Sequence, residues 1–64
     1  MNSKRYVLKT SEDFFYAIAA EKDVLVLSEY LIAGGKIQLA NDFAVLIGDE
    51  YYLRDECTFF VDSD

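Results

Sequence analysis

Short apolar runs separated by turn-forming residues limit what this chain can fold into. Apolar runs such as those at 24–27 and 43–47 contain only four or five residues. The sequence has no proline, so its turns must be made by Gly, Asn and Asp. In the second half of the chain the turns recur about every five to seven residues, which is typical of short strands. This spacing predicts an antiparallel meander with strands at 36–40, 43–47, 50–54 and 57–61.

A helix is predicted at about residues 12–22, after a short strand at 4–9. Thr10 or Ser11 suits the N-cap, because a hydroxyl oxygen can accept a free amide of the first turn. Glu12 and Asp13 then lie at the positive end of the helix dipole, and Lys22 is expected in the last turn. The apolar side of this helix is expected to contain Phe14, Phe15, Ile18 and Ala19.

Residues 24–33 allow two interpretations. As a strand, they lead into a two-residue hairpin turn at Gly34-Gly35, which places Ile32 opposite Ile37 and Tyr30 opposite Leu39. As a helix, they begin at an Asp23 cap and end at Gly34. The β-branched residues of this segment and the hairpin register favour the strand.

Together these elements predict an α+β fold in a single domain spanning 1–64. One N-terminal helix at about 12–22 packs on a small antiparallel β-meander or partly closed sheet. A chain of 64 residues buries only about 60% of the surface that it exposes when unfolded, so its core must be small. The expected core includes Val7, Phe15, Ile18, Ile37, Leu39 and Val45.

Both faces of the predicted meander carry large apolar side chains. With turns at 48–49 and 55–56, Val45 faces Tyr52 and Tyr52 faces Phe59 on one side. On the other side, Leu46 faces Tyr51 and Tyr51 faces Phe60. One short helix covers only one face. Either the sheet curls and buries more of its surface, or the second face binds another copy of the chain or a different protein.

Charge separates the expected partners from the excluded ones. The net charge is −6, and residues 41–64 hold seven acids against Arg54 alone. Such a chain is repelled by nucleic acid and by anionic membrane surfaces, so neither is expected as a direct partner. Cys57 is the single cysteine, the apolar run at 6–8 that follows Lys4 and Arg5 is too short for a signal peptide, and no apolar run is long enough to span a membrane. A reducing, cytoplasmic location is therefore expected.

The sequence lacks the residues of the common catalytic and metal sites. There is no histidine, and Cys57 stands alone, so Ser-His-Asp, Cys-His and thiolate zinc sites are not expected. Gly34-Gly35-Lys36 lacks the spacing of a phosphate-binding loop. We therefore expect no enzyme activity, no catalytic residue, no metal and no cofactor, and interpret Cys57 as a small core residue.

The residues expected to bind a partner lie in the acidic C-terminal half. Tyrosines next to carboxylates can supply rigid contact area beside groups that meet Lys or Arg. This pattern predicts a small protein-binding module for a basic protein, with the character of an inhibitor that mimics nucleic acid. The resemblance to acidic phage proteins that block CRISPR or restriction is one of size and charge, not of sequence. The alternative is a structural subunit or homodimer that uses an apolar sheet face. The expected site is Asp49, Glu50, Tyr51, Tyr52, Asp55 and Glu56.

Overall fold

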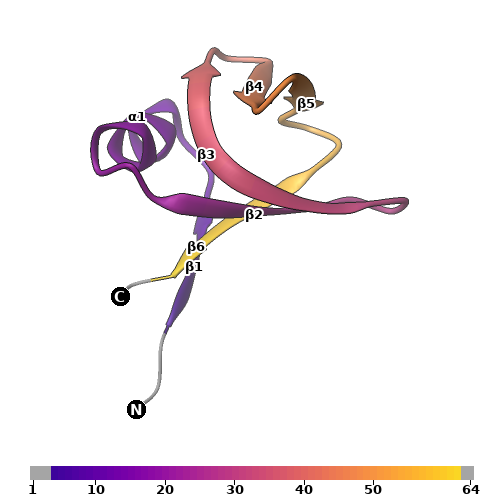
Figure 1. The fold of residues 1–64 in the computed structure, drawn as a ribbon, viewed down its shortest axis with the longest axis horizontal. Coiled ribbons are helices and arrows are strands. Elements are labelled where there is room, and N and C mark those ends of the chain that lie inside the picture. The colour runs from indigo at the N-terminus through magenta and orange to yellow at the C-terminus, as the bar shows by residue number, and fades with distance from the viewer. Residues whose placement is uncertain (1–3, 63–64) are drawn as a thin grey trace.

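The computed structural model describes residues 4–62, which form one helix and six strands (Figure 1). The predicted α+β arrangement is confirmed. The elements in chain order are β1 (Arg5–Leu8), α1 (Ser11–Ala19), β2 (Asp23–Leu27), β3 (Ile32–Ala40), β4 (Ala44–Ile47), β5 (Glu50–Leu53) and β6 (Thr58–Asp62).

The strands form one antiparallel sheet in the order β1-β6-β2-β3-β4-β5. The long strand β3 belongs to both halves of this sheet, pairing with β2 at its start and with β4 at its end. Its register shifts between Ile37 and Leu39, and the strand curves through a wide arc (Figure 1). Such an irregularity bends a strand, so the β4–β5 hairpin folds over the rest of the sheet. The sheet stays open, with β1 and β5 as its two edges.

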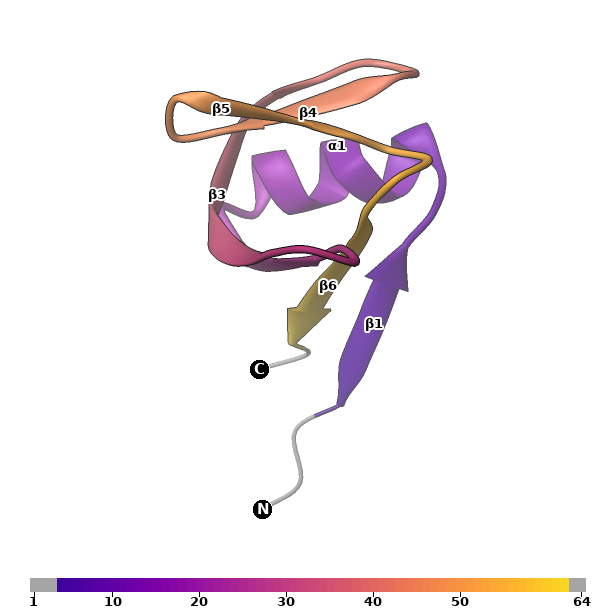
Figure 2. The same ribbon diagram turned by 90° about the vertical axis from the view of Figure 1, so that its right-hand side faces the viewer.

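Helix α1 lies inside the curl of the sheet, beneath the β4–β5 hairpin (Figure 2). Its start is fixed by a capping box, in which the Asp13 amide donates to Thr10 Oγ1 at 3.1 Å and the Thr10 amide donates to Asp13 Oδ2 at 3.0 Å. Its end comes earlier than predicted. Glu21 has a positive φ of 52°, so the chain leaves the helix before Lys22, which therefore lies beyond the last turn.

The buried side of α1 is rotated from the predicted one. Phe14 and Ala17 are buried, with Phe14 1% exposed, whereas Phe15 is 56% exposed. The ring of Phe14 meets Phe59 of β6 edge to face, with centroids 5.2 Å apart. The sheet covers the side of the helix that carries Phe14, and the adjacent Phe15 therefore points away from the sheet toward solvent. The core comprises Leu8, Phe14, Ala17, Val24, Val26, Ile37, Val45, Ile47, Phe59 and Val61.

Three of the six predicted core residues are therefore wrong. Ile37 and Val45 are buried and Ile18 packs against the core, but Val7, Phe15 and Leu39 are exposed. Leu39 faces outward because the register shift in β3 changes which side chains reach the concave face.

Residues 24–33 contain a strand, but the predicted hairpin turn at Gly34-Gly35 is wrong. The turn occupies 28–31, and both glycines lie within β3, opposite Leu25 and Val24. A Cβ on Gly34 would lie 3.1 Å from the carbonyl oxygen of Val24, and one on Gly35 would lie 3.0 Å from Ile47 Cγ2. Gly35 also has a φ of 146°. The glycines thus allow close approach of neighbouring elements where β3 bends.

The predicted partner of the last strand is also wrong. β4 and β5 form the expected hairpin, with Val45 opposite Tyr52 and Leu46 opposite Tyr51. However, β6 does not continue the meander beside β5, because it pairs with β1 and β2. Phe59 and Phe60 therefore face Val26 and Leu25 of β2 rather than tyrosines of β5.

Candidate functional site

The connection from β5 to β6 separates two grooves. Residues 54–57 leave the edge strand β5, cross one end of the molecule and enter β6 (Figure 1). Leu53, Asp55, Glu56 and Cys57 line both grooves. We call the groove that contains Lys9, Phe14, Asp42 and Arg54 the arginine groove, and the groove that contains Glu29, Tyr30, Tyr51 and Tyr52 the tyrosine groove.

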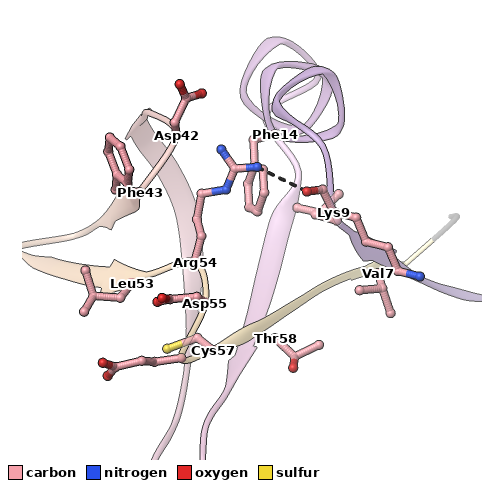
Figure 3. Close-up of a pocket in the computed structure, with 12 residues that line it drawn as sticks. Val7, Lys9, Phe14, Asp42, Phe43, Leu53, Arg54, Asp55, Cys57 and Thr58 are labelled. Carbon is pink, nitrogen blue, oxygen red and sulfur yellow. Dashed lines mark hydrogen bonds between the residues drawn. The ribbon is translucent and has the colours of Figure 1, made fainter.

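Arg54 dominates the arginine groove, which has a volume of about 580 Å³ (Figure 3). Its guanidinium donates to the Asn41 carbonyl at 2.7 Å and to the Lys9 carbonyl at 3.1 Å. It also donates to Ser11 Oγ at 3.2 Å, and its Cζ lies 4.5 Å from the centre of the Phe14 ring. One side chain thus joins the start of α1 to the β3–β4 connection.

The other polar groups near Arg54 also have partners within the fold. Ser11 Oγ lies 3.2 Å from Asp42 Oδ1, and Asn41 Oδ1 accepts the amides of Phe43 and Ala44, both at 2.8 Å. These contacts fix the β3–β4 turn against the helix start. The arginine groove is therefore built mainly from interactions that hold the fold together.

The tyrosine groove, with a volume of about 610 Å³, has a different character. One wall is formed by Tyr51, Tyr52, Leu53, Asp55, Glu56 and Cys57, and the other by the β2–β3 turn at 28–31. Tyr30 is 89% exposed and Tyr51 is 62% exposed, while Tyr52 is half-buried against the core. Large aromatic side chains thus face solvent from two segments that are far apart in the sequence.

Three carboxylates line the tyrosine groove, and none of the described Lys or Arg side chains does. They belong to Glu29, Asp55 and Glu56. The ion pairs seen among residues 4–62 lie elsewhere: Arg5 with Asp62 at 3.4 Å, and Lys36 with Asp23 at 3.2 Å. The groove therefore presents negative charge that no described cation offsets at close range.

The structure brings together four of the six predicted site residues. Tyr51, Tyr52, Asp55 and Glu56 line the tyrosine groove. Asp49 and Glu50 lie at the other end of β5, around the β4–β5 turn, and do not line it. A strand of this length separates its ends by roughly 10 Å, so the two acid pairs form separate groups.

Sequence reasoning missed Glu29 and Tyr30 on the opposite wall, and the role of Arg54. The signal for the first two lay in Ser28-Glu29-Tyr30, a polar interruption after the apolar run at 24–27 that could have been interpreted as the turn. The signal for Arg54 was its position as the single base among seven acids. Neither pattern reveals the tertiary contacts.

Cys57 lies between the grooves and is half-buried. Burial raises the pKa of its thiol, and the negative charges of Glu56 and Asp55 raise it further. A raised thiol pKa leaves less thiolate at neutral pH, so this environment disfavours nucleophilic chemistry. Its contact with the core agrees with the expected packing role, although the residue is not fully buried.

Within residues 4–62, no group of three or more Cys, Asp or Glu side chains is arranged to hold a metal ion. No helix in the described part of the chain has both the length and the apolar character needed to cross a membrane. Comparisons with protein-family models, curated proteins and solved structures found no match to this chain.

Proposed function

We propose that this protein is a non-enzymatic binding module whose tyrosine groove docks a basic surface of another protein. The observation that carries this proposal is the pairing of exposed tyrosines with carboxylates that have no cation partner among residues 4–62. Aromatic rings supply contact area and bind cations, while carboxylates increase association rate and specificity. A partner that uses a nucleic-acid-binding surface for this contact would be inhibited by it.

The two acid pairs provide a matched test of this function. Asp55→Ser with Glu56→Ser removes two charges from the wall that the tyrosine groove shares with the arginine groove, and Asp49→Ser with Glu50→Ser removes two charges from the far turn. Both double variants change the net charge equally, so long-range attraction to a basic protein changes equally as well. Each double variant is immobilised and used to capture the partner protein. We expect the Asp55/Glu56 variant to retain less partner than the Asp49/Glu50 variant at low salt, and the difference to shrink at high salt.

Duplex DNA added to the captured complex tests the inhibitor hypothesis. If the partner binds this protein through its nucleic-acid-binding surface, DNA should displace this protein from the partner, and more protein should be displaced at a higher DNA concentration. Equal partner retention by the two double variants would contradict the tyrosine groove as the site. Micromolar binding of this protein itself to random duplex DNA would contradict the expected absence of nucleic-acid binding.

A second candidate function is self-association through the outer face of the β3–β4–β5 region. Leu39 lies opposite Leu46, and Leu46 lies opposite Tyr51, which makes an apolar row across three strands. Leu39 and Tyr51 are exposed, and Leu46 is half-buried. Sedimentation of the parent and of Leu39→Ser decides this alternative, because a dimer formed by this row should dissociate in the variant.

A further inference from the structure

Strand β5 is an open edge of the sheet, because β4 is the only strand of residues 4–62 that pairs with it (Figure 2). The Arg54 amide donates to the Phe43 carbonyl at 2.8 Å, and these residues are opposite each other when the Ala44–Leu53 register is extended by one residue. Bonded and non-bonded pairs alternate along an antiparallel ladder. Tyr51 and Leu53 therefore direct their backbone groups away from β4, toward the open edge.

Part of this edge is already used by the chain. The Leu53 carbonyl accepts the amides of Glu56 and Cys57, at 3.2 and 3.1 Å. The Leu53 amide and both backbone groups of Tyr51 have no partner among the described residues. The tyrosine groove lies along this edge, because Tyr51, Tyr52 and Leu53 of β5 form one of its walls.

Charge selects the kind of segment that can pair there. Glu29, Asp55 and Glu56 line the groove, so a strand entering it meets three carboxylates. Two copies of β5 paired antiparallel would place the 49–50 acids of each copy near the 55–56 acids of the other. The net charge of −6 opposes the approach of a second copy as well. Lysine or arginine in the incoming strand would instead meet carboxylates and the exposed rings of Tyr30 and Tyr51.

We propose that the tyrosine groove binds an extended, lysine- or arginine-containing segment of a partner protein as an additional strand on the edge of β5. This inference rests on the proposed function and specifies how the basic partner is held. Backbone hydrogen bonds to Tyr51 and Leu53 supply affinity, and the carboxylates and tyrosines select for basic side chains.

The test uses the whole protein and a synthetic peptide in which lysine and threonine alternate. The first control replaces each lysine by glutamate. Two further peptides carry N-methyl groups on the backbone amides, one on the lysines and the other on the threonines. Only alternate residues of a strand direct their amides to a given neighbour. We expect one methylated peptide to bind at least about fivefold more weakly, the equivalent of one lost hydrogen bond, and the other to bind like the parent.

Amide hydrogen exchange measured by NMR locates the contact on the protein. Without peptide, Tyr51 and Leu53 should exchange faster than Tyr52, whose amide faces β4. With the lysine peptide, exchange at Tyr51 and Leu53 should slow. On the protein side, Leu53→Pro removes an outward amide at a position where an edge strand tolerates proline, and Leu53→Thr keeps that amide. Only the proline variant should lose peptide affinity.

Three results would overturn this proposal. Equal binding of both methylated peptides, with unchanged amide exchange at Tyr51 and Leu53, would exclude strand addition. The proposal that the groove binds a basic partner would still stand. Failure of the lysine peptide to bind better than the glutamate peptide would exclude the charge selection. Protected Tyr51 and Leu53 amides in a self-associated protein without peptide would show that a second copy occupies the edge.

Discussion

The arginine groove and the tyrosine groove share a wall, but their polar groups have different partners. Around Arg54, the guanidinium, hydroxyl and amide groups bind one another and the backbone. Around Tyr51, carboxylates, rings and backbone amides face solvent. Charge next to an aromatic ring therefore does not by itself indicate a binding site. What distinguishes the tyrosine groove is that its carboxylates and its exposed tyrosine side chains make no hydrogen bond or ion pair with other groups of residues 4–62.

The largest expected effect separates the two grooves by stability. Phe14→Ala should cost about 3–5 kcal/mol of unfolding free energy, because the buried ring lines the arginine groove and its removal would leave a cavity. The matched control is Phe15→Ala, which truncates an exposed ring of the same size and should cost less than about 1 kcal/mol. Urea unfolding of both variants measures the difference. Similar losses would mean that α1 docks through a different face.

Arg54→Met tests whether the arginine groove is structural. Methionine keeps an apolar stem but loses the three hydrogen bonds and the cation–π contact, so we expect a loss of about 2–3 kcal/mol in urea unfolding. Arg54→Lys should recover only part of this, because an ammonium group cannot reproduce the planar fork. Binding of the lysine peptide should stay at the parental level whenever the variant is folded. Parental stability in Arg54→Met would remove the contrast between the grooves.

The pH dependence of stability tests how much the Asp13 carboxylate stabilises the start of α1. This segment also supplies hydrogen-bond acceptors to Arg54. Hydrogen bonds from the backbone amides of Lys9 and Thr10 lower the pKa of Asp13 in the folded protein. A lowered folded pKa contributes stability above the ordinary Asp range and loses it as the pH falls through the folded value. Unfolding measured across the acidic range should therefore show a smaller pH dependence in Asp13→Asn than in the parent. An unchanged profile would contradict this role of Asp13.

The smallest expected effect on stability concerns the wall that both grooves share, which contains Asp55, Glu56 and Cys57. Asp55→Ser with Glu56→Ser should change the unfolding free energy by no more than about 0.5 kcal/mol, because both side chains are exposed. It should also lower the pKa of Cys57, since two negative charges are removed while the burial of the thiol remains. Alkylation of Cys57 near neutral pH should therefore be faster than in the parent. Asp49→Ser with Glu50→Ser is the control, and faster alkylation there would contradict the local cause.

The sequence by itself determined the features that depend on near neighbours. An N-cap at Thr10 or Ser11, the β4–β5 hairpin and the pairs Val45–Tyr52 and Leu46–Tyr51 were predictable from local patterns, and the structure has the cap at Thr10. Turn residues and side-chain alternation fix such pairings over a few residues. The same patterns indicated the tyrosines and acids of residues 51–56, which lie on one wall of the candidate site.

Only the tertiary structure decided which distant segments meet. Gly34 and Gly35 lie within a bent strand rather than in the predicted turn, at a point where β2 and Ile47 approach them closely. The pairing of β6 with β1 and β2 brought residues from both ends of the chain together, and the turn at 28–31 supplied Glu29 and Tyr30 to the groove. Local propensity assigns no energy to such contacts, because they form only when the core closes around Phe14 and the sheet curls around α1.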